Sequence, residues 1–331
     1  MSDSDVKPAA RPRPDIWNYR GPVQFSALFS GPFRPGQALA AIGKRWVTLS
    51  RNTLFLLFAV IVYTRFLPDI GRMTTLSADW ILPMFLRNVF FMVLVAGGLH
   101  LYLFTFRAQG SRLKFDPQEQ METGKRYSFG NQLHDNIFWS IASGVTLWTA
   151  YEVLYFWGVA NGVIPTFGFT EHPFLFALWL VAMPLLLSSH FYWIHRLLHW
   201  PPLYRSVHRL HHRNTHIGPW SGMSMHPVEH LLYLSSVLVH FVIASHPVIV
   251  LVHLYTRSLA PAFSHAGFEK VLVKERKLIE GADFHHQLHH RFFECNYGNV
   301  DMPWDRWFGS YHDGSDEATK RIRKGRKVVR P

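Results

Sequence analysis

Residues 173–199 read PFLFALWLVAMPLLLSSHFYWIHRLLH, an apolar stretch that ends in two histidines four residues apart. About 20 mostly apolar residues are enough for one helix to cross the hydrocarbon core of a bilayer. His195 and His199 would lie on one face of such a helix, because residues four apart are neighbours on its surface. The stretch therefore predicts a membrane helix that presents two imidazoles at one end.

The composition of the whole chain is typical of a membrane protein. Of its 331 residues, 48% are hydrophobic and only 17% are charged, whereas about 25% are charged in soluble domains. A single cysteine, Cys295, excludes an internal disulfide and any cysteine-built zinc or iron–sulfur site. Histidine is unusually frequent, with 21 residues, of which 17 lie between His190 and His290.

Four stretches have the apolarity expected of membrane helices, although the first is short. They are residues 54–67 with their flanks, 83–106, 137–160 and 173–194. Arg87 can extend its charge to the membrane interface. Residues 231–254 are also apolar but too short to cross twice, so we expect a re-entrant or surface-lying helical hairpin broken at Pro247.

Charges in the loops predict the orientation. Lys and Arg precede the first span and recur between the second and third, whereas residues 161–172 contain neither. The positive-inside rule therefore places the N-terminus and the 107–135 loop in the cytosol. Four crossings return the chain to the cytosol at His195, so we expect an all-α protein with a cytosolic helical cap. The lack of an endoplasmic-reticulum retention ending favours a bacterial inner membrane over the endoplasmic reticulum.

The chain is predicted to have four regions: a flexible tail (1–22), three membrane helices with their loops (23–172), a histidine-rich region (173–312) and a basic tail (313–331). The basic tail is expected to be solvated and partly disordered near anionic headgroups. No other feature of a nucleic-acid-binding protein accompanies it, so we expect no nucleic-acid partner.

Four histidine clusters follow one another in the third region. They are His195-Arg-Leu-Leu-His199, His208-Arg-Leu-His211-His212, His226-Pro-Val-Glu229-His230 and His285-His286-Gln-Leu-His289-His290. In the second cluster the three histidines share a helical face, so their nitrogens are expected to converge. The last three histidines of the fourth cluster repeat this spacing.

These clusters predict a metal site. Burying so many imidazoles without a shared partner would leave polar atoms unpaired, and neutral imidazole is a good ligand for Zn, Cu, Fe and Ni. Eight or more ligands exceed what one tetrahedral ion uses, so a dinuclear, all-histidine site is favoured. His265 could complete the set, and His216 and His285 could orient ligands. His240, His246 and His253 are interpreted as hydrogen-bonded core residues, and His100 and His134 as interfacial or loop residues.

The order HxxxH, HxxHH, HxxHH resembles the fatty acid hydroxylase/sterol desaturase superfamily of membrane di-iron oxygenases. Neighbouring residues are also similar, namely YWIHRLLH at 192–199, HPVEH at 226–230, NYG at 296–298 and PWDRWFGS at 303–310. The resemblance covers residues 173 to 311. One departure is visible: many members carry an Asp several residues before the first motif, where this chain has Ser188, Ser189 and His190.

The resemblance implies a fatty acid hydroxylase-like catalytic region that binds two iron ions in the cytosolic cap. It implies O₂-dependent hydroxylation or desaturation of a lipid, such as a fatty acyl chain or a sterol. The ligands that it implies are His195, His199, His208, His211, His212, His286, His289 and His290, while His226, His230 and His265 match positions whose role varies between members. It implies no catalytic residue beyond the metal ligands.

Two electrons must reach such a site from the cytosol. The sequence contains no HPGG-type haem segment, no CxxCH and no GxGxxG fingerprint. We therefore expect a separate electron donor, which could be a ferredoxin, a cytochrome or a reductase.

Two other functions remain open. His226-Pro-Val-Glu229-His230 fits the inverted HxxEH pattern of a zinc metalloprotease, but that function leaves the other three clusters unexplained. A non-enzymatic metal transporter would spread its histidines along the membrane spans, whereas the clusters are expected at one cytosolic depth. Metal content separates these functions, because an oxygenase would hold near two irons and a hydrolase one zinc.

Overall fold

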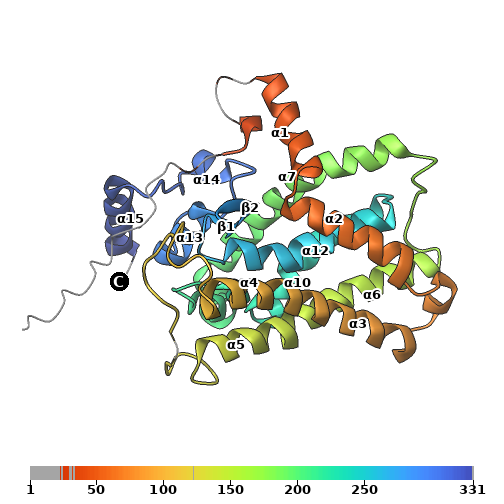
Figure 1. Ribbon diagram of the computed structural model, residues 1–331, viewed down its shortest axis with the longest axis horizontal. Coiled ribbons are helices and arrows are strands. Elements are labelled where there is room, and N and C mark those ends of the chain that lie inside the picture. The colour runs from red at the N-terminus through yellow and green to blue at the C-terminus, as the bar shows by residue number, and fades with distance from the viewer. Residues whose placement is uncertain (1–22, 24, 30–31, 33, 122, 330–331) are drawn as a thin grey trace, which may run out of the picture.

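The apolar segments form long helices that lie side by side along the length of the molecule (Figure 1). This computed structural model describes residues 23, 25–29, 32, 34–121 and 123–329; the expected tail at residues 1–22 lies outside the described residues.

The helices and strands are α1 (Pro35–Val47), α2 (Arg51–Ile61), α3 (Ala78–Met92), α4 (Gly98–His100), α5 (Gln132–Trp139), α6 (Thr146–Ala160), α7 (Pro173–Leu198), α8 (Pro201–Leu203), α9 (Arg209–His212), α10 (Pro227–Leu234), α11 (Val239–Val242), α12 (Pro247–Ser264), β1 (Lys270–Val273), β2 (Arg276–Glu280), α13 (Phe284–Phe292), α14 (Trp304–Trp307) and α15 (Asp316–Val329). The 3₁₀- and π-helical segments are η1 (Ala27–Phe29), η2 (Val62–Phe66), η3 (Ile70–Thr74), η4 (Val93–Gly97), η5 (Leu101–Thr105), η6 (Ser140–Val145), η7 (Tyr204–His208), η8 (Pro219–Met223) and η9 (Ser235–Leu238).

Two helices in the described part of the chain are long and apolar enough to cross a membrane, Ala78–Thr105 and Pro173–Leu198. A third candidate is the pair Pro35–Trp46 and Arg51–Phe66, which is bent by 46°. The stretch expected to span at 137–160 is helical but is not among these candidates. It carries buried polar residues such as Glu152. The structure thus has two or three candidate spans instead of the expected four.

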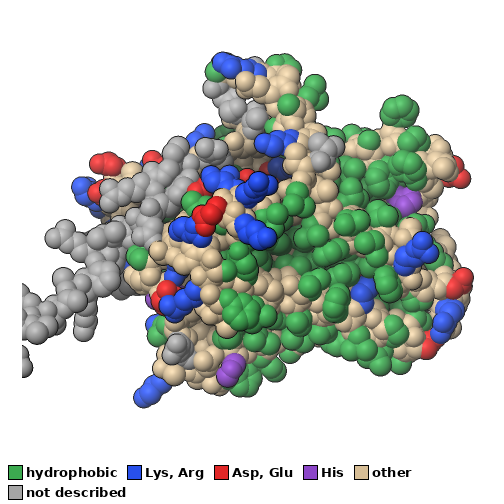
Figure 2. Space-filling model, viewed as in Figure 1, with side chains coloured by type: hydrophobic (Ala, Val, Ile, Leu, Met, Phe, Trp, Pro, Cys, Tyr) green, Lys and Arg blue, Asp and Glu red, His purple; other side chains and the backbone are tan. Residues whose placement is uncertain are grey.

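One face of the molecule is strongly apolar. Hydrophobic side chains cover the surface of α2 and α3 in Figure 2, where Leu57, Leu86 and Phe90 are each more than half exposed. Soluble monomers rarely expose a continuous apolar patch of this extent. The exposed side chains are therefore those that contact lipid, as expected of a membrane protein.

Arg87 does not extend to the interface as expected. Its guanidinium forms an ion pair with Glu152 of α6, and the neighbouring Asn88 donates a hydrogen bond to Glu152 Oε2 (2.9 Å) and another to Thr149 Oγ1 (3.1 Å). Charged groups within membrane helices are stabilised when they pair with one another. The polar face of α6 therefore neutralises the charge of α3, a pairing that spacing along the sequence does not reveal.

The expected hairpin at 231–254 is broken where the sequence indicated, but it does not lie on the surface. Residues 243–246 separate α11 from α12, and Pro247 occupies the first turn of α12, where its missing N–H costs no hydrogen bond. Fifteen of the eighteen residues of α12 are buried. This helix forms part of the main core with α2, α6 and α7, so it is the central element that carries His265 toward the other histidines.

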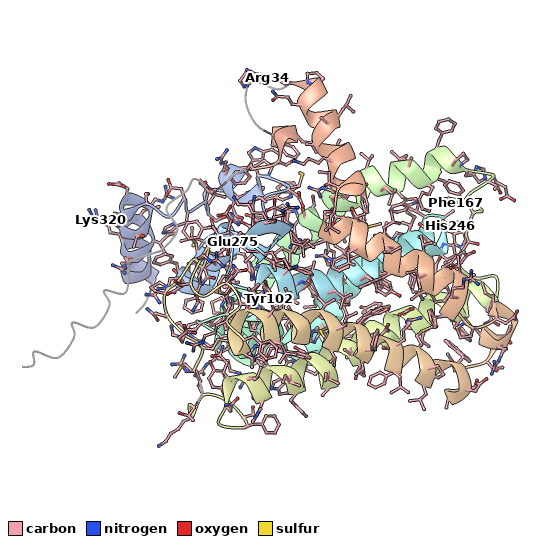
Figure 3. All side chains as sticks on the ribbon, viewed as in Figure 1. Arg34, Tyr102, Phe167, His246, Glu275 and Lys320 are labelled. Carbon is pink, nitrogen blue, oxygen red and sulfur yellow. The ribbon has the colours of Figure 1, made fainter. Side chains whose placement is uncertain are left out.

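The expectation of an all-α protein is wrong at one place. Strands β1 and β2 form an antiparallel hairpin in which Val273 pairs with Arg276. The two loop residues, Lys274 and Glu275, both have positive φ, as a two-residue type I′ turn requires. Figure 3 places Glu275 at this turn, and Tyr102 at the end of the α3–η5 helix donates a hydrogen bond to Leu272 O (2.5 Å).

The basic tail also differs from the expectation of partial disorder. Residues 316–329 form α15, at the end of the molecule where Figure 3 shows Lys320. Ala318 and Thr319 are buried, and Thr319 Oγ1 lies 3.2 Å from His312 Nε2. Ile322 packs against a buried apolar cluster, so the first two turns of α15 attach it to the rest of the chain.

Replacing Gly222 by alanine is expected to lower the free energy of unfolding by about 1–3 kcal/mol, the usual effect of overpacking. Gly222 lies in η8, and a Cβ there would be 2.5 Å from the carbonyl carbon of Pro261 in α12. The matched control is Gly43→Ala in α1, where a Cβ meets nothing within 4 Å and alanine favours the helix. Thermal unfolding in detergent measures both, and a Gly222→Ala protein as stable as the parent would contradict this packing.

Candidate metal centre

Four segments bring histidines to one place. His195 lies in the last turns of α7 and His199 caps that helix, while His208, His211 and His212 follow on η7 and α9. His265 caps the C-terminus of α12, and α13 contributes its histidines from the opposite side. All of these imidazoles are buried except that of His199, which is partly exposed.

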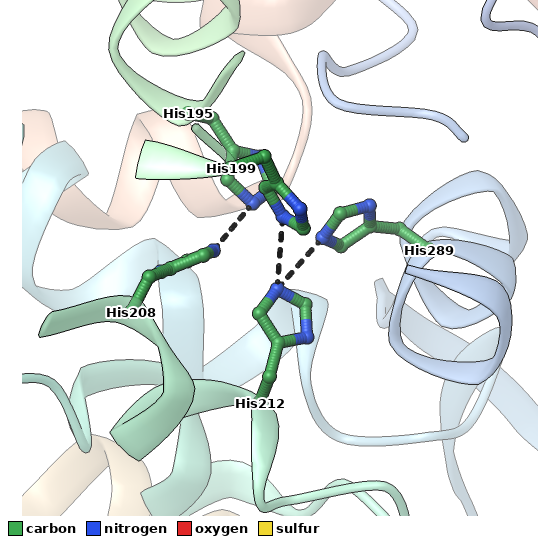
Figure 4. A group of neighbouring side chains, drawn as sticks. All are labelled: His195, His199, His208, His212 and His289. Atoms are coloured by element: carbon green, nitrogen blue, oxygen red, sulfur yellow. Dashed lines mark hydrogen bonds between the residues drawn. The ribbon is translucent and has the colours of Figure 1, made fainter. Parts of the chain in front are cut away.

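The first imidazole group consists of His195, His199, His208, His212 and His289, whose ligand nitrogens all lie within 4.8 Å of one another (Figure 4). The Nε2 atoms of His199 and His289 are each 3.1 Å from His212 Nε2, and those of His195 and His208 are 3.1 Å apart. Imidazole nitrogens held at about 2.1 Å from one ion at right angles are about 3 Å from each other. The spacing therefore suits a shared metal ion.

The second imidazole group consists of His211, His265, His286 and His290, again within 4.8 Å of one another. His265 Nε2 lies 3.0 Å from His290 Nε2 and 3.2 Å from His286 Nε2. The two groups adjoin, because the rings of His212 and His290 are 5.0 Å apart. Two adjacent groups of buried imidazoles are consistent with a metal site.

The HxxHH motifs do not converge as expected. His208 and His212 enter the first group, whereas His211 points into the second. The α13 motif divides in the same way. His289 belongs to the first group, and His286 and His290 belong to the second. Residues i and i+4 share one side of a helical turn and residue i+3 is displaced around it, so each motif reaches both groups.

Hydrogen bonds at Nδ1 orient five of the nine rings. Backbone carbonyls face four of these nitrogens, those of His195 (Tyr297 O, 2.6 Å), His289 (Cys295 O, 2.7 Å), His265 (Pro261 O, 2.9 Å) and His211 (Ser224 O, 3.3 Å). A carbonyl can only accept, so Nδ1 carries the proton and Nε2 keeps its lone pair. This is the arrangement found at histidine metal ligands.

Glu229 orients the fifth ring, a role that the HxxEH pattern does not reveal. His208 Nδ1 lies 2.7 Å from Glu229 Oε1, and both side chains are buried. The sequence had presented Glu229 only as the carboxylate of HxxEH. In the structure it is instead the acceptor that fixes His208, as carboxylates do in carboxylate–histidine–metal arrangements.

Asp305 explains part of the PWDRWFGS motif. Its carboxylate accepts hydrogen bonds from the backbone of Tyr297 and Gly298 (both 2.8 Å) and from Ser310 Oγ (2.7 Å). This network holds the loop whose Tyr297 carbonyl accepts from His195. Asp305 also lies 3.5 Å from His285 Nε2, so His285 contacts the loop and not the two groups.

Two predicted site residues lie outside both groups. His226 caps α10 by accepting a hydrogen bond from Val228 N (3.2 Å), and His230 Nδ1 lies 2.7 Å from Ser143 Oγ. Neither joins Glu229 in a cluster within the described chain, so the HxxEH segment forms no three-ligand site there. The other nine predicted histidines are all brought together.

The remaining histidines contact other parts of the molecule. His240 and His253 are hydrogen-bonded to each other at 2.8 Å, as expected of core residues. His246 lies beside Phe167, at the end of the molecule away from Lys320 (Figure 3). His216 faces Gln118, and His100 stacks on Phe104.

Burial keeps the grouped imidazoles neutral. Desolvation lowers the pKa of His211 to about 4 and holds the pKa values of His212 and His289 well below their usual range. Charging these rings would place several cations together in an environment with little water. Neutral imidazole is the form that binds a metal.

A cavity of about 700 Å³ opens beside the two groups. Five of the nine imidazoles border it, and its wall includes apolar side chains of α7 such as Met183, Leu187 and Phe191. Its lining also includes residues of the α1–α2 junction and of β2, a region where charged side chains lie in Figure 2. The site can therefore accept a long apolar molecule.

Comparison with known proteins agrees with the geometry. Residues 180–310 match the family Fatty acid hydroxylase. Similar proteins include a Delta(7)-sterol 5(6)-desaturase of Gibberella zeae (34% identical over 128 residues, 36% of this chain and 37% of that protein) and a methylsterol monooxygenase of Aspergillus fumigatus (34% over 140 residues, 38% and 44%). A lathosterol oxidase of Mus musculus is 37% identical over 135 residues, 38% of this chain and 42% of that protein. No solved structure matches this chain.

The match is confined to one part of the chain. It spans less than half the length of these three relatives, and it contains the helices that carry both imidazole groups. The resemblance drawn from the histidine motifs is thereby confirmed. Residues 180–310 of this chain belong to the fatty acid hydroxylase superfamily.

Proposed function

We propose that this chain is a membrane di-iron oxygenase that hydroxylates or desaturates a lipid with O₂ and two external electrons. The observation that carries the proposal is the adjacency of two buried, neutral imidazole groups to a largely apolar cavity. Side chains alone cannot break an alkyl C–H bond, and a pair of iron ions would supply the activation of O₂ that this requires.

The described residues fit such a metal pair. The first imidazole group would hold one ion and the second group the other, and the Nδ1 contacts leave Nε2 available as the ligand atom. His226 and His230 would stay outside the ligand set, as positioning residues of α10. The donor set contains only nitrogen, which suits iron and also zinc or copper.

The cavity would orient the lipid. The apolar side chains of α7 would contact the chain of the lipid, and the five imidazoles that border the cavity would lie next to the carbon that reacts. The three relatives are named for reactions on sterols, which supports a lipid substrate for this chain as well.

The orientation is part of the proposal. We infer four crossings, with 54–67, 83–106, 137–160 and 173–194 in the bilayer, and with residues 231–254 as a re-entrant segment. The metal site would face the cytosol of a bacterium, where a separate ferredoxin, cytochrome or reductase could supply electrons. The basic loops on that side support this orientation.

Metal content tests the proposal directly. The full chain, purified in neutral detergent from cells grown with iron, is expected to contain about two irons per chain, because each imidazole group suits one ion. Elemental analysis of the protein gives the number. A single zinc per chain, or a metal-free protein that stays folded and active, would exclude a di-iron oxygenase.

A further inference from the structure

Arg257, in the middle of α12, is a buried cation with no acidic partner. It is 5% exposed, and within the described residues no carboxylate lies within 4 Å of it, although Arg45, Arg87 and Arg213 each have one. Burying an unpaired charge is costly, and such a charge is normally neutralised by a counter-ion. A missing counter-ion beside a cavity indicates that a ligand supplies it.

The contacts of Arg257 are all with neutral groups. Its Nη2 donates to Leu187 O (2.9 Å) and to His190 Nδ1 (3.2 Å), and its Nε donates to Ser236 Oγ (3.0 Å). The ring of Tyr233 lies 4.9 Å from the guanidinium carbon. The Tyr233 hydroxyl is a further neutral hydrogen-bond partner of the guanidinium, and no carboxylate contacts it within the described chain. These contacts hold the guanidinium in one orientation without neutralising its charge.

Arg257 also lines the cavity that borders the metal site, together with Ser188 of α7. Ser188 is 1% exposed, and its buried hydroxyl has no hydrogen-bond partner in the described chain. A guanidinium without an acidic partner and a hydroxyl without any partner, both on the wall of one cavity, suit a group with several acceptor oxygens. Apolar side chains of α7, such as Met183 and Leu187, lie on the same wall.

Arg257 and the imidazole groups border the cavity at different points along α12. Arg257 precedes His265 by eight residues on the same helix, a rise of about 12 Å. A molecule held at Arg257 could therefore place a carbon of its chain beside the imidazole groups. The part of the lining around the α1–α2 junction and β2 is charged, with the cations Lys44, Arg51 and Lys277 and the acids Glu280, Asp283 and Asp301.

We propose that Arg257, assisted by Ser188, binds the anionic end of the lipid substrate, so that the substrate is a single-chain lipid ending in a carboxylate or a phosphate. A neutral lipid such as a free sterol would leave the guanidinium without a counter-ion. This inference rests on the proposed function, because it names the class of lipid that would react at the metal pair.

Binding measurements on the full chain in neutral detergent test the proposal. The probes are radiolabelled hexadecanoate, hexadecyl phosphate, hexadecanol and cholesterol, which separate the carboxylate and phosphate ends from neutral lipids. The parent protein is expected to bind at least one of the two anions about tenfold more tightly than hexadecanol, since charge-assisted hydrogen bonds to a guanidinium are roughly twice as strong as neutral ones. Comparison of the two anions identifies which end the site prefers.

The variants assign that preference to Arg257. Arg257→Gln is expected to remove the tenfold preference, and Arg257→Lys to keep part of it, because it retains the charge but not the planar fork. Ser188→Ala should lower anion affinity a few-fold with little effect on hexadecanol. Arg276→Gln is the matched control, because Arg276 is exposed on β2 and does not line the cavity. Thermal unfolding of each variant checks that it is folded.

Three outcomes would overturn the proposal. They are equal affinity of the parent for hexadecanol and both anions, tighter binding of cholesterol than of either anion, and an unchanged anion preference in folded Arg257→Gln. The first two need no variant. The iron content of the same samples tests the oxygenase function separately. A protein that holds no iron pair but still prefers the anions through Arg257 would contradict the oxygenase function and leave the anion site intact.

Discussion

His289→Ala is expected to abolish turnover and to lower the iron content from about two ions per chain to about one. His289 Nε2 lies 3.1 Å from His212 Nε2 in the first imidazole group, and its Nδ1 is fixed by the Cys295 carbonyl. Removing the ring deletes a ligand that no neighbouring side chain replaces. Elemental analysis and a whole-cell assay for oxygenated lipid measure the two effects.

The same substitution at His211 provides a comparison between the groups. His211→Ala should lose the ion of the second group instead, again with loss of turnover. His100→Ala is the control, since His100 stacks on Phe104 and belongs to neither group. It should keep both iron content and activity. Full iron and full turnover in His289→Ala would refute the assignment of the first group.

Glu229→Leu is expected to weaken iron binding about 10- to 100-fold, the usual effect of removing a partner that orients a ligand. The Glu229 carboxylate is the acceptor for His208 Nδ1 at 2.7 Å, so its loss frees the ring to turn and to move its proton to Nε2. Glu229→Gln keeps an acceptor oxygen in the same place and should be affected less. Titration of the metal-free protein with Fe²⁺ gives both affinities.

His226→Ala controls for damage to α10. His226 precedes the same helix and caps it, but it lies outside both imidazole groups. Its removal should reduce stability, by about 1 kcal/mol for a lost cap, while iron affinity stays unchanged. If instead His226→Ala weakens iron binding as much as Glu229→Leu does, the role assigned to the Glu229–His208 contact is wrong.

The residue types of the centre could be predicted from the sequence because their spacing is local. HxxxH and HxxHH place imidazoles on one side of a short helix whatever the rest of the chain does. Eight of the nine grouped histidines lie in these motifs, and the ninth, His265, is an isolated histidine that no spacing rule identifies. The other two predicted residues, His226 and His230, belong to a motif in which proline and glutamate have separate local roles.

The division of each motif between two groups could not be predicted in this way. It depends on α7, α9, α12 and α13 approaching from different directions, so that His208 and His211 of one motif face different neighbours. The carbonyls of Tyr297 and Cys295 were also beyond prediction, since every residue has a carbonyl and only the folded loop aims these two at a histidine.

By itself, the sequence determined that this protein is mostly helical and apolar, and that its histidine-rich region resembles the fatty acid hydroxylase family. Hydropathy and helical spacing depend on neighbours within a few residues, so they can be recognised from the sequence alone. Only the tertiary structure decided that Arg87 pairs with Glu152, that α12 is central, and that Arg257 lines the cavity without a counter-ion. These features join residues that are tens of positions apart, and their energies arise from burial, which exists only once the helices have packed.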